Sequence, residues 1–275
     1  MNFYQPTTIE EALALAGPNT RFLAGGTDLV LQMREGKIMP KTLIDLGRIQ
    51  QLQQVIRNGA WLEIGSMVTF SNLSDHELVR SHAHALWQAC RTMGSPQVRN
   101  QATIGGNLGN NSPAADGLPP LLVLDARVKV AVPQGEKLLP IAEVIKTPLP
   151  YDHLIVGFCI PLNQWQSGFA KLGRRNALAI ARLSVALAVQ SEGNRVKDIR
   201  VALGAVGRQA FLADDLAKSL VNQSVDETWI ELAVAEAKKV VGQALGERPS
   251  AAYKRVAAGG VMRKAIQSLA LQKGG

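Results

Sequence analysis

The stretch Arg21-Phe22-Leu23-Ala24-Gly25-Gly26-Thr27-Asp28 decides how the first part of this chain is interpreted. Its short apolar run predicts a buried strand, and the two glycines that follow predict a tight loop. A helix-like pattern continues over residues 29–34, and Thr8-Ile9-Glu10-Glu11 is a capping box that opens an earlier helix. Such a loop exposes backbone N–H groups that a phosphate can approach closely. A tight strand-to-helix turn without a ligand explains the same pattern equally well.

A second glycine stretch, Ala102-Thr103-Ile104-Gly105-Gly106-Asn107, lies within residues 94–118, whose Gly, Asn, Ser, Pro and Ala content predicts a long loop. Small polar residues follow at 110–112 and at Asp116, and they can hydrogen-bond a sugar or a phosphate. An irregular loop that satisfies its own backbone also accounts for them. Two such stretches favour a dinucleotide over coincidence. Neither matches G-x-G-x-x-G or G-x-x-x-x-G-K-[ST], so a Rossmann site and a P-loop are not expected.

The rest of the chain predicts antiparallel sheet followed by helices. Asn58-Gly59 between two apolar runs is a strong hairpin signal, and Leu73–Met93 predicts one long helix. Beyond a polar linker at 163–167, strands are predicted at 169–174, 180–190 and 199–204, and helices at 227–241 and 251–271. We therefore expect an α+β protein. Its N-terminal domain spans residues 1–165, with subdomains of about 1–55 and 56–165, and an antiparallel sheet plus a helical cluster forms a C-terminal domain over 168–275.

Composition limits the function further. The 275 residues carry a net charge of +8, which fits nucleic acid, an anionic ligand, an acidic partner or a generally basic surface. Only 5% of residues are aromatic and none interleave with a basic run, so nucleic acid is not expected. No apolar run reaches the ~18 residues of a membrane span, and the N-terminus lacks a signal-peptide pattern, so we expect a cytoplasmic protein. Cys90 and Cys159 alone build neither a disulfide framework nor a thiolate metal site.

No catalytic residue and no metal ligand is assigned. The chain has no nucleophile elbow G-x-S-x-G and no H-E-x-x-H. His82 and His84 stand two residues apart and do not share a helix face. A third candidate for ligand binding is Lys171-Leu172-Gly173-Arg174-Arg175, a strand whose basic residues can direct a cation at an anionic ligand. Taken alone, this pattern is better explained by a solvated strand edge.

Taken in order, five motifs resemble the FAD-binding medium subunit of the molybdenum hydroxylases, the group of xanthine dehydrogenases and carbon monoxide dehydrogenase. They are AGGTD at 24–28, TIGGN at 103–107, SPAAD at 112–116, LDARV at 124–128 and FAKLGRR at 169–175. The resemblance covers essentially the whole chain. It implies a vanillyl-alcohol-oxidase-type FAD-binding fold, in which two N-terminal subdomains hold the cofactor and a C-terminal domain closes over it.

The resemblance also implies roles for individual residues. Residues 21–28 would wrap the pyrophosphate, and residues 103–107 would form a second phosphate and ribose wall. Asp116 would bind a cofactor hydroxyl, Ile155 would lie near the flavin ring, and Lys171 would lie near its pyrimidine end, where a cation stabilises the reduced anion. The implied cofactor-binding residues are Arg21, Phe22, Leu23, Ala24, Gly25, Gly26, Thr27, Asp28, Thr103, Ile104, Gly105, Gly106, Asn107, Asp116, Ile155 and Lys171. Neither glycine stretch contains a histidine that could tether the cofactor, so FAD is expected to bind non-covalently.

The implied function is electron transfer within a heteromer. A small [2Fe–2S] subunit and a large molybdopterin subunit would be the partners, and electrons would leave the FAD for NAD or another acceptor. Two other functions stay open at this point. One is a flavin-free basic scaffold or binding subunit, motivated by the net charge of +8; the other is a stand-alone FAD oxidase.

Overall fold

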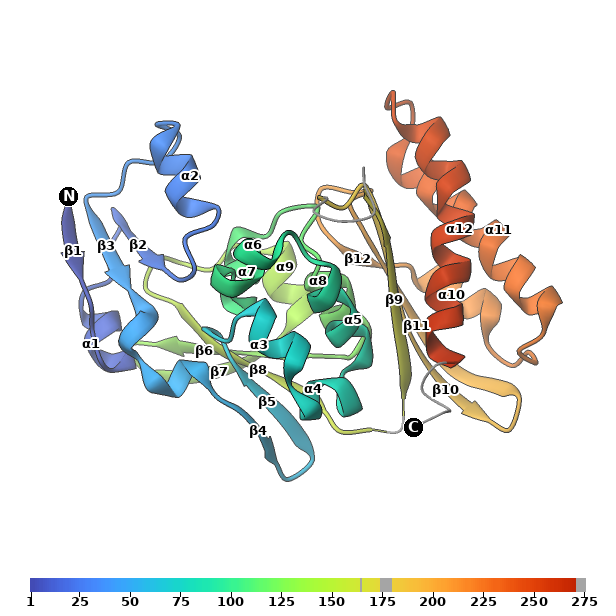
Figure 1. The fold of residues 1–275 in the computed structure, drawn as a ribbon, viewed down its shortest axis with the longest axis horizontal. Coiled ribbons are helices and arrows are strands. Elements are labelled where there is room, and N and C mark those ends of the chain that lie inside the picture. Colours follow the sequence, from blue (N-terminus) through green and yellow to red (C-terminus); the bar gives the residue numbers. More distant parts are fainter. Residues whose placement is uncertain (164, 174–179, 271–275) are drawn as a thin grey trace.

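The computed structural model describes residues 1–163, 165–173 and 180–270. Arg174 and Arg175 of the basic strand motif, and the last residues of the expected C-terminal domain, 271–275, lie outside this range. Figure 1 shows three parts side by side: a small N-terminal sheet, a group of helices over a larger sheet, and a C-terminal sheet backed by long helices. No helix among the described residues is long and apolar enough to cross a membrane.

The N-terminal part is a three-stranded parallel sheet in the order β1-β3-β2. The predicted capping box is present: the Thr8 hydroxyl accepts from the N–H of Glu11 at 3.1 Å, and the Glu11 carboxylate accepts from the N–H of Thr7 at 2.8 Å. The predicted order of helix, strand, glycine loop and helix is therefore confirmed. The elements are β1 (Asn2–Tyr4), α1 (Ile9–Ala14), β2 (Thr20–Leu23), α2 (Leu29–Arg34), β3 (Thr42–Asp45), η1 (Leu46–Arg48) and η2 (Gln50–Gln53).

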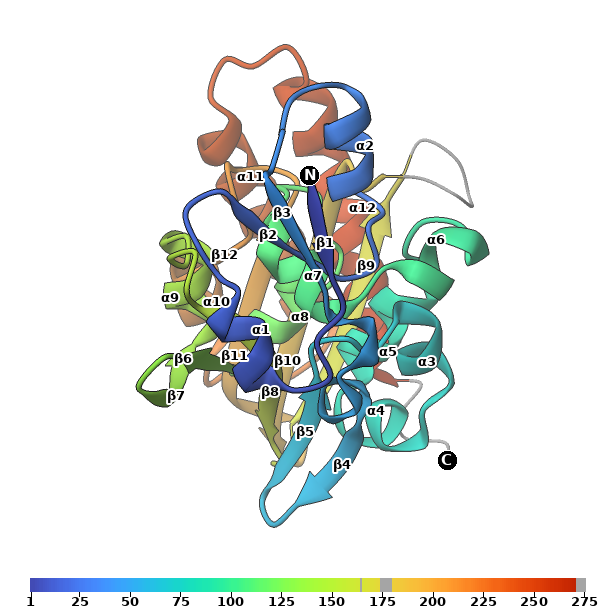
Figure 2. The same ribbon diagram turned by 90° about the vertical axis from the view of Figure 1, so that its left-hand side faces the viewer.

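The central part is a five-stranded antiparallel sheet in the order β4-β5-β8-β6-β7, with helices packed against it. The hairpin at Asn58-Gly59 is confirmed, and Gly59 has the positive φ of +55° that the tight turn requires. Figure 2 shows this hairpin projecting away from the rest of the molecule, with the N-terminal sheet nearest the viewer. The strands are β4 (Val55–Asn58), β5 (Trp61–Gly65), β6 (Arg127–Val132), β7 (Gly135–Pro140) and β8 (Leu154–Pro161).

Two predictions for the central helices are wrong. The single helix expected over Leu73–Met93 is divided into three short helices. The backbone is extended at His76, and it departs from helical geometry again at Ala83. The long loop expected over residues 94–118 contains two helices that begin at side-chain caps, Ser95 and Thr103. The helices are α3 (Phe70–Asp75), α4 (Glu77–His82), α5 (His84–Thr92), α6 (Pro96–Gln101), α7 (Ile104–Asn110), α8 (Leu118–Val123) and α9 (Ile141–Lys146).

The C-terminal part is a four-stranded antiparallel sheet, in the order β12-β11-β10-β9, followed by helices, as predicted. The strand predicted to start at Phe169 begins earlier, at Gln166, so it takes up the end of the predicted linker. The elements are β9 (Gln166–Leu172), β10 (Leu183–Glu192), β11 (Arg195–Gly204), β12 (Phe211–Leu212), α10 (Asp214–Leu220), α11 (Glu227–Leu245) and α12 (Ala251–Ala270).

The C-terminal sheet is covered on both faces. Its large side chains, such as Leu183 and Leu187 of β10, share a core with α11 and α12, while the small Ala186 and Ala188 share the core of the central helices. At Gly204 a Cβ atom would lie 2.9 Å from Pro119 Cγ of α8, so a larger residue would push the helix away. Small residues on this face therefore let the central helices pack directly on the C-terminal sheet, as seen in Figure 1.

Candidate functional site

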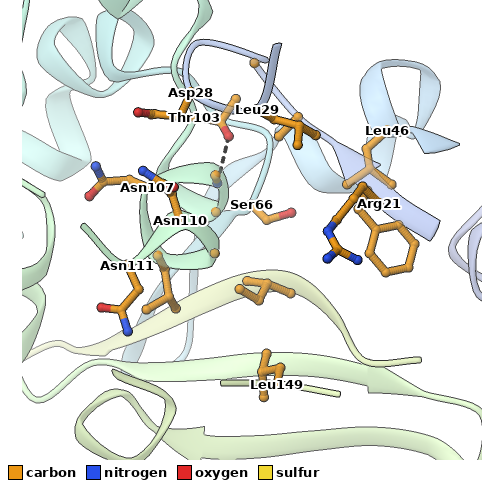
Figure 3. Close-up of a pocket in the computed structure, with 18 of the residues that line it drawn as sticks. Arg21, Asp28, Leu29, Leu46, Ser66, Thr103, Asn107, Asn110, Asn111 and Leu149 are labelled. Carbon is orange, nitrogen blue, oxygen red and sulfur yellow. Dashed lines mark hydrogen bonds between the residues drawn. The ribbon is translucent and has the colours of Figure 1, made fainter. Parts of the chain in front are cut away.

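A cavity of about 620 Å³ opens where the N-terminal and central parts meet. Figure 3 shows Arg21 and Leu46 on one side of it, Asn107, Asn110 and Asn111 on the opposite side, and Leu149 on a third. Ligand sites for small molecules and cofactors have volumes of this size and combine an apolar lining with a few directed polar groups. The cavity is therefore the candidate binding site.

The first glycine stretch forms one side of the cavity as the loop between β2 and α2. Gly26 has a φ of +70°, a conformation that side-chain-bearing residues rarely adopt. A Cβ atom on Gly25 would lie only 1.7 Å from the carbonyl oxygen of Gln101, at the end of α6. The absence of a side chain at Gly25 thus lets this loop lie directly against the chain that leads into the second glycine stretch.

The second glycine stretch is the first turn of α7. The Thr103 hydroxyl accepts a hydrogen bond from the N–H of Gly106 at 3.0 Å, the dashed line in Figure 3, and so starts the helix. A Cβ atom on Gly105 would come within 2.5 Å of Ser66 Cβ, and the N–H of Gly105 donates to the Ser66 carbonyl at 2.8 Å. Close backbone contact with the end of β5 therefore requires glycine here.

Two buried oxygen atoms at the cavity have no hydrogen-bond partner among the described residues: Ser66 Oγ and Asn111 Oδ1. Unpaired buried polar atoms are costly, and a bound ligand is one way to satisfy them. Asn111 is held in a left-handed conformation, with a φ of 45°, and its Nδ2 donates to the carbonyl of Ile145 at 2.8 Å. Its amide oxygen is thus fixed and available to a ligand that donates a hydrogen bond.

Among the described lining residues, Arg21 supplies positive charge and Asp28 supplies negative charge. Arg21 is the only arginine or lysine among the described residues that line it, and its guanidinium donates to the carbonyl of Thr20 at 2.9 Å. Across the cavity, Gln32 of α2 donates to the Asn110 side chain at 3.3 Å and so links the two glycine stretches. A fixed cation beside exposed backbone N–H groups suits the phosphates of a dinucleotide.

Apolar side chains also line the cavity. Met67, Met93, Leu149, Leu154 and Ile155 line it, together with the half-exposed Tyr151. Such a surface accepts a flat aromatic ring and removes it from water. The cavity therefore offers polar groups for phosphates and sugars and apolar side chains for a ring, the two kinds of chemistry that FAD combines. The residues present fit that cofactor.

Most of the residues expected from the sequence to bind a cofactor lie together at this cavity. Leu23, Ile104, Asp116 and Lys171 do not line it: Leu23 and Ile104 belong to the same stretches as lining residues, and Ile104 lies in the hydrophobic core. Several lining residues were not expected. They include Leu29, Gln32, Leu46, Ser66, Asn111 and residues 148–151 and 153–154, of which only Asn111 stood in a stretch noted for its polar residues.

Asp116 and Lys171 form an ion pair with each other. Lys171 Nζ of β9 lies 2.6 Å from Asp116 Oδ2, and the exposed fractions of the two side chains are 9% and 5%. Burial raises the pKa of Asp116 to about 6, and the charge and hydrogen bond of Lys171 only partly oppose that rise. The second carboxylate oxygen, Asp116 Oδ1, is buried and has no hydrogen-bond partner among the described residues.

Comparison with known proteins gives matches along nearly the whole chain. Residues 1–163 match the family of the FAD binding domain in molybdopterin dehydrogenase, and residues 168–269 match the CO dehydrogenase flavoprotein C-terminal domain. The chain is 29% identical to the nicotinate dehydrogenase FAD-subunit of Eubacterium barkeri, covering 95% of this chain and 93% of that one. It is 26% identical to the carbon monoxide dehydrogenase medium chain of Hydrogenophaga pseudoflava, covering 97% and 96%.

Comparison with solved structures supports the same family. A carbon monoxide dehydrogenase structure from Hydrogenophaga pseudoflava aligns with a TM-score of 0.90 at 26% identity, over 99% of this chain and 98% of that one. Quinoline 2-oxidoreductase from Pseudomonas putida 86 has a TM-score of 0.88 at 22% identity, a likeness of fold alone. The α+β class and the FAD-binding fold expected from the sequence are confirmed.

Proposed function

The chain belongs to the family of FAD-binding subunits of the molybdenum hydroxylases, and from this premise we propose that it is the electron-transfer subunit of such an enzyme. Bound FAD supplies the redox chemistry, and this chain supplies binding, orientation and electrostatics. In the proposal, electrons arrive from [2Fe–2S] clusters on a small partner subunit, a large partner holds the molybdopterin, and NAD or another acceptor takes the electrons up. The relatives named above are an FAD-subunit and a medium chain of dehydrogenases.

The cavity between the two glycine stretches carries this proposal. Its volume of about 620 Å³, the cation at Arg21 and its apolar side chains match the parts of FAD. Close backbone contacts at Gly25 and Gly105 bring two distant segments into one binding surface. We propose that residues 21–28 and 103–107 hold the pyrophosphate and ribose, and that Ile155 lies against the ring.

We extend the proposal to Asp116 and Lys171. A carboxylate with one buried, unpartnered oxygen is suited to accept a hydrogen bond from a cofactor hydroxyl. A buried lysine beside it is suited to stabilise negative charge at the pyrimidine end of a reduced flavin. FAD is proposed to bind without a covalent bond, since neither glycine stretch contains a histidine or cysteine.

The domain division is also part of the proposal, with an FAD-binding domain over 1–165 and a C-terminal flavoprotein domain over 168–275. The limits of the two family matches, 1–163 and 168–269, support it. We further propose that the heteromer is cytoplasmic. Cys90 and Cys159 are both free and buried, as is usual for a protein of a reducing compartment.

An absorption spectrum of the purified chain, before and after adding FAD and removing the excess, tests cofactor binding. We expect retained bands at about 375 and about 450 nm, the positions of a bound flavin. A folded chain that retains no flavin, either alone or in complex with its co-purified partners, would contradict the proposal. For electron transfer, substrate added to the complex should bleach the longer-wavelength band, and NAD should restore it if NAD is the acceptor.

A further inference from the structure

The C-terminal domain is connected to the cavity without lining it. All described residues that line the cavity fall between Thr20 and Ile155, so none belongs to the C-terminal sheet or its helices. One connection runs through the short segment Pro113–Gly117, which lies between α7 and α8.

The C-terminal sheet binds this segment at two points. The N–H of Ala205, at the end of β11, donates to the carbonyl of Pro113 at 2.7 Å. Lys171, near the end of β9, binds Asp116 at 2.6 Å. Ala205 itself has a φ of 61°, unusual for a residue with a side chain, so its N–H is held in a constrained orientation. Two strands of one sheet, β9 and β11, which flank β10, thus bind the segment Pro113–Gly117 near both of its ends.

The same segment holds a residue of the cavity. The N–H of Gly117 donates to Asn107 Oδ1 at 3.2 Å, and Asn107 lines the cavity from α7. The fit is tight, since a Cβ atom on Gly117 would lie 2.8 Å from that same amide oxygen. A displacement of Asp116 therefore moves Gly117 and changes the orientation of the Asn107 side chain.

Stability alone is a poor explanation for the ion pair. Taking two charges out of water is costly, and replacing a buried ion pair by apolar side chains is often neutral or stabilising. Here the apolar contacts of β10 with the central helices already hold the two domains together. The ion pair instead fixes the orientation of one side chain in each domain.

We propose that Lys171 is a positioning residue: by binding Asp116, it holds the segment Pro113–Gly117 and, through Gly117, sets Asn107 in the orientation that receives FAD. The C-terminal domain thereby controls the affinity of a cavity that lies outside it. This role is additional to direct contact of Lys171 with the cofactor and rests on the proposed function for its ligand.

The first test is hydrogen exchange of the FAD-free full chain, followed over residues 104–117. In Lys171→Met we expect exchange there to rise by about tenfold or more, and in Lys171→Arg to stay near that of the unmodified chain. The control is Lys129→Met, which breaks the half-buried Lys129–Glu63 pair of 2.8 Å within the five-stranded sheet. Unchanged exchange over 104–117 in Lys171→Met, or an equal rise in Lys129→Met, overturns the proposal. If Lys171→Met does not fold, Asp116→Asn replaces it with the same expectations.

The second test is a double-mutant cycle on the affinity for FAD. Lys171→Met should raise the Kd by about tenfold in the unmodified chain but by only about twofold when Asn107→Ala is already present, because the two residues act in series. An equal effect in both backgrounds means that Lys171 acts by direct contact alone and refutes the positioning role. An unmodified chain that takes up no FAD, either alone or in complex with its co-purified partners, refutes the proposed function instead, and the exchange experiment still decides the coupling.

Discussion

The substitution Asp116→Asn should change how the stability of the FAD-free chain depends on pH. The Asp116 side chain is 5% exposed, and burial raises its pKa from an ordinary 3.8 to about 6 in spite of the neighbouring Lys171. The folded chain therefore holds the proton more tightly than the unfolded chain does. As pH rises through this interval the folded state must give up a proton that the unfolded state has already lost, so folding becomes less favourable.

The size of the effect follows from the two pKa values. At about 1.36 kcal/mol for each pKa unit, a rise from 3.8 to about 6 corresponds to about 3 kcal/mol. The unmodified chain should lose this stability relative to Asp116→Asn between pH ~4 and pH ~6. Above that interval Asp116 is ionised in both states, and the difference between the two proteins should become constant.

Urea unfolding of both proteins at pH values from about 4 to about 8 measures this difference, because all other titrating groups are common to them. Asp215→Asn is the matched control, since it removes a carboxylate that is 96% exposed and paired only loosely with Lys218. A difference that stays constant over the whole range would refute the reasoning. A difference that grows in favour of the unmodified chain with rising pH would show that the charge of Lys171 outweighs burial.

Three further substitutions have defined outcomes. Gly25→Ala places a Cβ atom 1.7 Å from the Gln101 carbonyl and should weaken FAD binding by about tenfold or more in an absorbance titration; a change within about twofold would contradict the close contact. Gly260→Ala, inside α12 with nothing within 4 Å, should stabilise the chain by about 0.5–1 kcal/mol in urea and leave the FAD affinity unchanged. Trp229→Phe removes a buried N–H donor to the Leu220 carbonyl at 3.0 Å and should cost about 1–3 kcal/mol in thermal unfolding; an unaltered melting temperature would mean that the bond contributes nothing.

Local sequence signals were enough to predict the elements that form through interactions between residues close together in the chain. The strand and glycine loop of residues 21–28, the hairpin at Asn58-Gly59 and the C-terminal helices all depend on turn chemistry or on hydrophobic periodicity. The helix α7 does not. Its sequence, IGGNLGN, is poor in helix formers, and it is helical because Thr103 caps it and Gly105 packs on Ser66. Contacts with a strand some forty residues earlier in the chain therefore override a composition typical of a loop.

The helix breaks at His76 and Ala83 escaped prediction for the opposite reason. Apolar residues keep a roughly helical spacing through Leu73–Met93, so the pattern continues although the helix does not. The His76 imidazole accepts from the N–H of Leu78 at 3.3 Å and starts a new helix in mid-pattern. Histidine is not among the usual capping residues, so the sequence contains no signal for this break.

The pairing of Asp116 with Lys171 could not be predicted from the sequence. Each residue stands in a motif that the resemblance relates to the cofactor, so both were expected as separate ligand contacts. The structure joins them to each other at 2.6 Å, although 55 residues of chain separate them. No local pattern encodes such a pairing, because it depends on how β9 packs against the segment between α7 and α8. A sequence motif can therefore predict which residues lie near a binding site. Whether those residues also bind each other depends on the packing of the folded chain.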